Sequence, residues 1–202
     1  MLIEQPTFIL DKIYPKALFR KNPEEHSVYL TFDDGPIPEV TPWVLDTLDK
    51  YGIKATFFVV GDNVKKYPEL LKDIIDRGHR VGNHTFNHVR GMQMRPHDYV
   101  ENIKKCDRYF TSNLFRPPHG IMRRWVYRNM RPEYEIVFYD VVTRDYSSKL
   151  NGNRVFRNVK QNTRNGSIIV FHDSLRSESR LKFALPKSIE WLKEQGYSFK
   201  LL

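Results

Sequence analysis

Two adjacent carboxylates, Asp33 and Asp34, directly follow a short apolar segment at residues 28–32. The Gly35-Pro36 pair that comes next ends the strand that this segment predicts. Because neighbouring side chains on a regular strand point to opposite faces, a turn is needed here to direct both acids into one space. Two such carboxylates repel each other unless a cation lies beside them. The motif therefore predicts a metal or a basic neighbour; the simpler interpretation is an Asp-Gly turn with two solvated acids.

Two histidines four positions apart, His84 and His88, follow another short predicted strand. Such a pair can reach one point in space from a helical turn or from a compact loop after a strand. With Asp34 they make two imidazoles and one carboxylate, which leaves a coordination position open for water or substrate. The set suits Zn²⁺, and Co²⁺, Fe²⁺ or Ni²⁺ could use the same ligands. For the histidines alone, a surface turn is the simpler interpretation.

The rest of the chain supplies the elements that must position these residues. Predicted strands, among them one at 135–141, alternate throughout with predicted helices, among them those that begin at Thr41 and Pro68. This alternation is typical of an α/β protein with a parallel sheet. About seven such units favour a closed or nearly closed (β/α) barrel. In these barrels the carboxyl ends of the strands carry the chemistry. The polar candidates all come just after predicted strands, at 33–34, 84–88, 116–120, 140–145 and 172–173.

The length of 202 residues predicts one domain with a full core. We expect an irregular N-terminal lead-in at 1–27 and a single catalytic barrel domain at 28–202. No apolar run approaches the ~20 residues of a membrane span. The N-terminus lacks a recognisable secretory signal, which favours a cytoplasmic location. The single cysteine, Cys106, excludes an internal disulfide and is expected to be a small core residue.

The net charge of +9 would suit an anionic polymer, a phospholipid surface or nucleic acid. The charge is spread along the chain, however, and no nucleic-acid-binding signature is present, so we expect no nucleic-acid partner. The densest basic segment lies within residues 121–130, whose apolar residues fall at helical spacing. We interpret it as a surface helix with a solvated basic side. Nothing in the sequence specifies an oligomeric state.

The ordered motifs at 31–36, 84–88, 116–120, 140–145 and 170–173 resemble those of the polysaccharide deacetylase family. This family is the NodB-homology domain of carbohydrate esterase family 4. The likeness spans roughly residues 27 to 202, and five ordered motifs are a strong signal. It implies a distorted (β/α) barrel that removes acetyl groups from N-acetylated sugars with a divalent metal. It also makes the cell envelope an alternative location.

The resemblance implies roles for particular residues by position. Its metal ligands match Asp34, His84 and His88. Its catalytic residues match Asp33 as general base, His172 as general acid, Arg116 as the arginine that holds the base, and Asp145 as the acid that tunes the histidine. A structural ion pair between Asp33 and His172 is the simpler alternative for those two residues.

The resemblance also implies a substrate pocket, formed by Pro118, His119, Gly120, Tyr146 and Val170. The backbone N–H of His119 would form part of an oxyanion hole, and Val170 would line the acetyl pocket. The family usually has an aromatic residue, often tyrosine, at His119, and tryptophan at Tyr146. Both departures bear on the choice of substrate more than on the reaction.

Together these features predict a metal-dependent hydrolase that removes N-acetyl groups from a polysaccharide or oligosaccharide, either peptidoglycan-like or chitin-like. Its partner would be an acetylated glycan. Its cofactor would be one divalent metal ion, for which Zn²⁺ is the first candidate. The nearest alternative is a hydrolase of another C–N amide bond, such as a lipid-linked aminosugar deformylase. An alternative of another class is a non-catalytic glycan- or nucleic-acid-binding protein.

Overall fold

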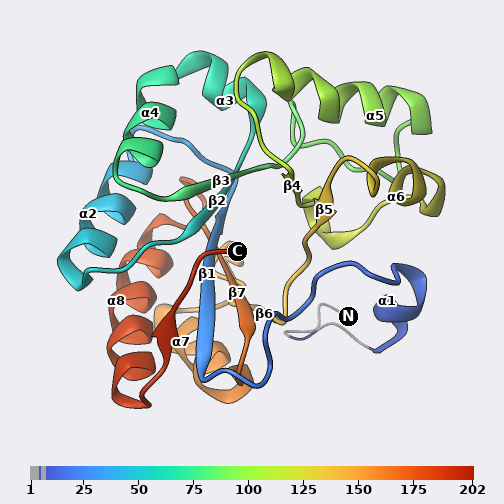
Figure 1. The fold of residues 1–202 in the computed structure, drawn as a ribbon. Coiled ribbons are helices and arrows are strands. Elements are labelled where there is room, and N and C mark those ends of the chain that lie inside the picture. The colour runs from blue at the N-terminus through green and yellow to red at the C-terminus, as the bar shows by residue number, and fades with distance from the viewer. Residues whose placement is uncertain (1–4, 6–7) are drawn as a thin grey trace.

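One curved sheet of parallel strands organises the molecule (Figure 1). The computed structural model describes residue 5 and residues 8–202. Along the sheet the order is β5-β4-β3-β2-β1-β7-β6, and β8 pairs with β1. This arrangement confirms the predicted distorted (β/α) barrel of about seven parallel strands. The strands are β1 Ser27–Asp33, β2 Thr56–Val59, β3 Arg80–Asn83, β4 Leu114–Phe115, β5 Glu135–Ile136, β6 Val141–Val142, β7 Ser167–His172 and β8 Ser198–Phe199.

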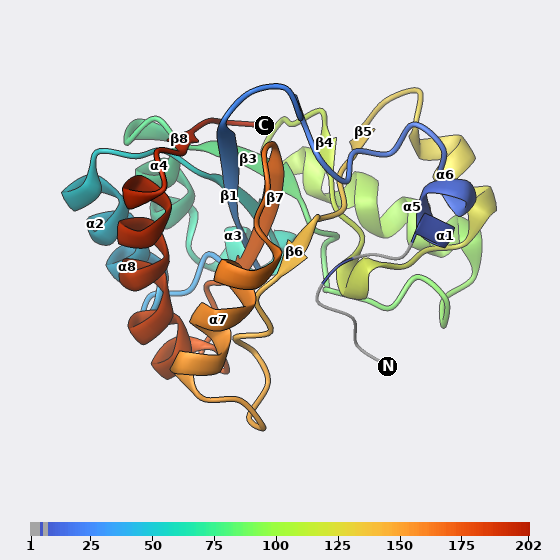
Figure 2. The same ribbon diagram turned by 90° about the horizontal axis from the view of Figure 1, so that it is seen from below.

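Helices cover the outside of this sheet in two groups, and Figure 2 shows α2 and α8 on one side of β1 and β7, with α1, α5 and α6 on the other. Proline occupies the first turn of α2, α4 and α5, where its missing N–H costs no hydrogen bond. No helix in the described residues is long and apolar enough to cross a bilayer. The helices are α1 Phe8–Ile13, α2 Thr41–Tyr51, α3 Gly61–Lys66, α4 Pro68–Asp76, α5 Pro96–Lys104, α6 Arg124–Met130, α7 Gly152–Asn162 and α8 Glu178–Glu194.

The apolar side chains of strand β1 point alternately into two different apolar clusters. Leu30 and Phe32 pack into the large core that the strands share with α2, α4, α7 and α8. Tyr29 belongs instead to a smaller cluster with Phe58 of β2 and residues of β4 and β7. Because side chains on a strand alternate between faces, Thr31 and Asp33 share the face of Tyr29, toward the inside of the barrel.

The N-terminal lead-in contributes to the barrel. Its expected span of 1–27 includes residues outside the described part. The rest is not irregular throughout, as was predicted, because it contains α1 and two isolated bridges. Leu18 bridges Val137, just after β5, and Arg20 bridges Ser167 at the start of β7. These backbone hydrogen bonds join the β5 edge of the sheet to β7 through a segment that precedes β1. The lead-in therefore closes the barrel at the amino end of β7.

Three further elements differ from their sequence-based expectations. The single strand expected at 135–141 is divided into β5 and β6, because Val137 bridges Leu18 and Asp140 pairs with Arg164. The helix expected at 121–130 begins only at Arg124. Helix α3 was not expected, since a helix of six residues is too short to show a helical period.

Candidate functional site

A cavity of about 440 Å³ opens at the carboxyl ends of the strands. Strand register explains why two of its lining residues are neighbours: Asp33 of β1 lies directly opposite His172 of β7. Both side chains point into the cavity from neighbouring strands. Their juxtaposition therefore follows from sheet pairing between residues far apart in the sequence. The predicted catalytic and metal-binding residues that line the cavity are Asp33, Asp34, His84, His88, Arg116 and His172.

A left-handed backbone conformation directs the second acid into the same space. Asp34 has φ of 85°, a value that non-glycine residues rarely adopt. The carbonyl of Asp34 accepts a hydrogen bond of 2.8 Å from the side chain of Asn63, in α3. The predicted turn after the strand is present, and it brings both carboxylates to one cavity.

Asp173 holds this turn from behind. Its Oδ1 accepts the N–H of Gly35 at 3.1 Å, and its Oδ2 accepts the hydroxyl of Thr41 at 2.6 Å. A Cβ at Gly35 would lie 2.0 Å from the Asp173 carboxylate, so only glycine fits there. Burial raises the pKa of Asp173 to about 8, although these hydrogen bonds act in the opposite direction. No role was predicted for Asp173, although its position directly after His172 made it visible in the sequence.

We expect Asp173→Ala to lower the free energy of unfolding by about 2–4 kcal/mol, because it leaves two buried donors without acceptors. Asp173→Asn is the matched control, since its amide oxygen can still accept from Gly35, and its cost should be clearly smaller. Urea unfolding of the three proteins measures the difference. Equal stabilities of Asp173→Ala and the wild type would show that Asp173 does not support the turn.

Asp34, His84 and His88 form the one group of potential metal ligands in the described residues whose ligand atoms all lie within 4.8 Å of one another. His84 follows β3 directly, and its Nδ1 lies 2.8 Å from the carbonyl oxygen of Arg116. That contact requires the proton on Nδ1, so Nε2 is left as a lone-pair donor facing the acids. Nε2 of His84 lies 3.8 Å from Oδ1 of Asp34.

The loop between the two histidines is shaped by side-chain amides. Asn83 accepts the N–H of Thr85 at 2.8 Å, and Asn102 of α5 accepts the N–H of Phe86 at 2.9 Å. Thr85 and His88 have φ of 65° and 52°, so the loop folds back tightly after β3. Of the two arrangements that the spacing of His84 and His88 allowed, the compact loop after a strand is the one observed.

The geometry and charge of this group fit a divalent metal. Oδ1 of Asp34 lies 3.1 Å from Nε2 of His88 but makes no hydrogen bond, so a buried lone pair is left without a donor. A buried acceptor of this kind costs free energy unless a cation or donor satisfies it. Burial works to raise the pKa of Asp34, but His88, His172 and His84 together lower it below its usual range. The carboxylate is therefore ionised, as metal binding requires.

Arg116 anchors Asp33. Nη1 of Arg116 donates to Oδ1 of Asp33 at 2.6 Å and to the hydroxyl of Thr31 at 2.8 Å. Nη2 donates to the carbonyl of Phe138 at 2.9 Å, and the guanidinium lies 4.0 Å from the ring centre of Phe58. The whole side chain is buried, with 2% exposed. One oxygen of Asp33 is thus fixed, and Oδ2 remains available toward the histidines.

Asp145 holds His172 in place, as Arg116 does Asp33. Oδ1 of Asp145 lies 2.8 Å from Nδ1 of His172, and Oδ2 accepts the backbone N–H of the same histidine at 2.8 Å. Burial lowers the pKa of His172, but the charge and hydrogen bond of Asp145 outweigh it and raise the pKa to about 9. His172 is therefore protonated near neutral pH. Asp145 itself is fully buried behind the histidine.

Most of the predicted substrate positions also line the cavity. Its lining residues include His119, Gly120, Tyr146 and Val170. Pro118 is buried outside the cavity, and Pro117 lines it instead. The ring of Tyr146 packs edge-on against His172, with 4.9 Å between ring centres. His119 lies beside His88, with 4.9 Å between their ring centres, and has φ of 62°.

Five further lining residues escaped the sequence analysis: Arg90, Tyr139, Val142, Ser174 and Arg176. Ser174 and Arg176 follow the strand-end segment 172–173, and Arg90 follows the histidine loop, so their positions carried a detectable signal. Tyr139 carried no such signal because it fell inside the strand expected at 135–141, and Val142 carried none because it is an apolar member of the segment 140–145.

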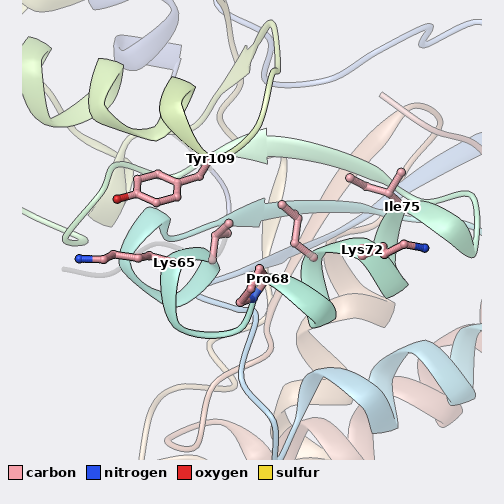
Figure 3. Close-up of a pocket in the computed structure, with 7 residues that line it drawn as sticks. Lys65, Pro68, Lys72, Ile75 and Tyr109 are labelled. Atoms are coloured by element: carbon pink, nitrogen blue, oxygen red, sulfur yellow. The ribbon is translucent and has the colours of Figure 1, made fainter.

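A second cavity, also of about 440 Å³, lies between α3, α4 and Tyr109 (Figure 3). Its lining is mainly apolar, with Pro68 and Ile75 on α4, and the ammonium groups of Lys65 and Lys72 extend away from each other. Its lining contains no carboxylate or imidazole. It therefore offers neither metal ligands nor an acid–base pair.

Comparisons with known proteins agree with this geometry. The family model described as polysaccharide deacetylase matches residues 20–132. A peptidoglycan-N-acetylglucosamine deacetylase of Bacillus cereus is 33% identical over 183 residues, which cover 87% of this chain and 85% of that protein. The peptidoglycan-N-acetylmuramic acid deacetylase PdaA of Bacillus subtilis is 32% identical over 197 residues, covering 91% of this chain and 73% of that protein.

The solved structures agree as well. The crystal structure of the Bc1960 peptidoglycan N-acetylglucosamine deacetylase superposes with a TM-score of 0.88 at 30% sequence identity. The match covers 98% of this chain and 95% of the other. That structure was solved in complex with 4-naphthalen-1-yl-N-oxidanyl-benzamide.

Proposed function

Because this chain belongs to the polysaccharide deacetylase family, we propose that it is an N-deacetylase that removes acetyl groups from the aminosugars of peptidoglycan. One observation carries the proposal: strand register sets Asp33 and His172 side by side over a two-histidine, one-aspartate group in a single cavity. A fixed base, a fixed acid and a candidate metal group are the parts that amide hydrolysis needs. The relatives named above supply the substrate class.

Asp33 and His172 divide the proton transfers of the reaction. Asp33, held through one oxygen by Arg116, would accept a proton from the attacking water at its free oxygen. His172, protonated near neutral pH, would donate a proton to the amide nitrogen as the C–N bond breaks. Acetate and a free amine are the products.

Asp34, His84 and His88 would hold one divalent metal, and we propose Zn²⁺ because two imidazoles and a carboxylate suit it. When bound, the metal would supply Lewis-acid polarisation of the acetyl carbonyl. The carbonyl of Arg116 keeps His84 in the tautomer that can act as a ligand. Val170 and Tyr146 line the cavity beside His172 and would contact the acetyl methyl group.

Release of acetate from a panel of glycans tests the proposed function. The panel would contain peptidoglycan strands, chitin oligomers, a formylated aminosugar lipid and a small acetamide. We expect turnover of peptidoglycan strands to exceed that of the last two. Formate release in place of acetate would favour the deformylase alternative, and binding without any turnover would favour a non-catalytic glycan-binding protein.

We expect His84→Ala to weaken Zn²⁺ binding by more than roughly 100-fold, beyond the 10–100-fold that loss of an outer hydrogen-bond partner costs. The reason is that His84 contributes one of three ligands. Elemental analysis before and after Zn²⁺ addition measures the change. His97→Ala is the matched control, since His97 is an exposed histidine outside the group and its loss should leave metal content intact. Unchanged metal content in His84→Ala would refute the ligand assignment.

A further inference from the structure

Two arginines lie among the residues that line the candidate active-site cavity, and the reaction does not use them. Arg90 and Arg176 are both exposed. In the described part of the chain, neither guanidinium makes an ion pair or a hydrogen bond, and Arg176 only accepts one from Arg180 through its backbone oxygen. Other arginines are paired: Arg77 with three aspartates and Arg95 with Asp98. The cavity mouth therefore presents two arginines whose charge no protein group neutralises.

The two arginines approach the cavity from different elements. Arg90 follows the histidine loop after β3, and Arg176 follows residues 172–173 after β7. In the sheet order β3-β2-β1-β7, strand β1 with its two acids lies between these loops. The arginines therefore come from opposite sides of Asp33 and Asp34. A sugar bound over these acids would have cationic groups on both sides.

The charges inside the cavity are already matched. Arg116 neutralises Asp33 at 2.6 Å, and Asp145 neutralises His172 at 2.8 Å. Asp34 belongs to the candidate metal group. The positive charges of Arg90 and Arg176 are therefore available to bind an anionic group of a ligand. A planar guanidinium binds carboxylates through paired N–H donors, so a carboxylate is the complementary group.

We propose that Arg90 and Arg176 bind a carboxylate carried by the glycan, so that this site prefers acidic N-acetylated aminosugar strands to neutral ones. The inference rests on the proposed function and narrows its substrate class. The lactyl carboxylate of a muramic acid residue, free of its peptide, has this chemistry, whereas a chitin strand has no carboxylate. The net charge of +9 acts in the same direction by attracting anionic polymers.

The test compares two substrates that differ only in charge: peptidoglycan strands stripped of their peptides, and the same strands with their carboxyl groups reduced to alcohols. The variant is Arg90→Gln with Arg176→Gln. The matched control is Arg124→Gln with Arg128→Gln, which removes the same charge from α6, outside the cavity lining. Acetate release provides KM and kcat, and calorimetry provides Kd for both strands.

In the wild type we expect KM and Kd to be at least about tenfold lower for the acidic strands, which corresponds to one well-placed charged hydrogen bond. The cavity variant should lose most of this preference, while the α6 control should keep it. Equal affinity of the wild type for both strands would overturn the inference, as would equal losses on both strands in the cavity variant. Arginine-dependent binding without acetate release would support the inference and count against the proposed deacetylation.

Discussion

Replacing Asp33 with asparagine should lower kcat by roughly 10²–10⁴-fold, the range for loss of a positioned proton-transfer group. The amide keeps the shape of the side chain and can still accept from Arg116, but it cannot take a proton from water. Metal content should stay at the wild-type level, because Asp33 is not one of the three clustered ligands. Acetate release and elemental analysis of the same preparation measure both quantities.

The change also removes the counter-charge of a buried arginine, and such an unpaired charge destabilises a protein by roughly 3–5 kcal/mol. Stability must therefore be separated from catalysis. Thr31→Val is the matched control: it removes another hydrogen bond to Arg116 and leaves the carboxylate in place. We expect this control to lose stability but to keep kcat within roughly tenfold of the wild type. Near-normal turnover by a folded, metal-loaded Asp33→Asn would exclude Asp33 as the base.

Replacing His172 with alanine should cost a similar factor of roughly 10²–10⁴ in kcat. The departing amine would then lack a nearby proton donor, while metal content should again be unchanged. The simpler alternative, a structural ion pair between Asp33 and His172, predicts a loss of stability with little loss of turnover. Unfolding curves and acetate release on the same variant decide between the two. Near-normal turnover by a metal-loaded His172→Ala would refute its role as the acid.

The pH profile gives an independent test of His172. Since Asp145 raises the pKa of His172 to about 9, the acid form persists through neutral pH and is lost above it. A divalent metal bound nearby would repel the imidazolium and lower this pKa, so we expect the basic limb of activity at or below pH 9. By linkage, the stability that Asp145 contributes is present below about pH 6.5 and lost as the pH rises through the folded-state pKa.

Asp145→Asn should move the basic limb to lower pH by roughly 1–3 units, because the imidazolium loses its charged partner. The hydrogen bond to the backbone N–H of His172 can remain through the amide oxygen. A merely structural role for Asp145 would lower stability without moving the limb. Profiles of kcat over pH for the two proteins settle which description holds.

Much of the barrel and its site could be predicted from the sequence alone. Apolar segments bounded by glycine and proline marked strands such as β1 and helices such as α2 and α4, because these signals act within a few residues of the chain. The same local pattern put the candidate polar residues directly after strands. Parallel strands align their carboxyl ends, so a common site for Asp34, His84 and His172 followed from fold class and motif order.

The tertiary structure decided what depends on contacts between distant segments. Sheet register set Asp33 opposite His172, and the carbonyl of Arg116 selected the tautomer of His84. The bridges of Leu18 and Arg20 closed the barrel, and the contacts of Val137 with Leu18 and of Asp140 with Arg164 divided the strand expected at 135–141. No local pattern encodes these pairings, because register is set by the packing of whole faces against one another. The amino-acid sequence by itself determined which side chains could react, and tertiary packing determined which atoms of other residues these side chains contact.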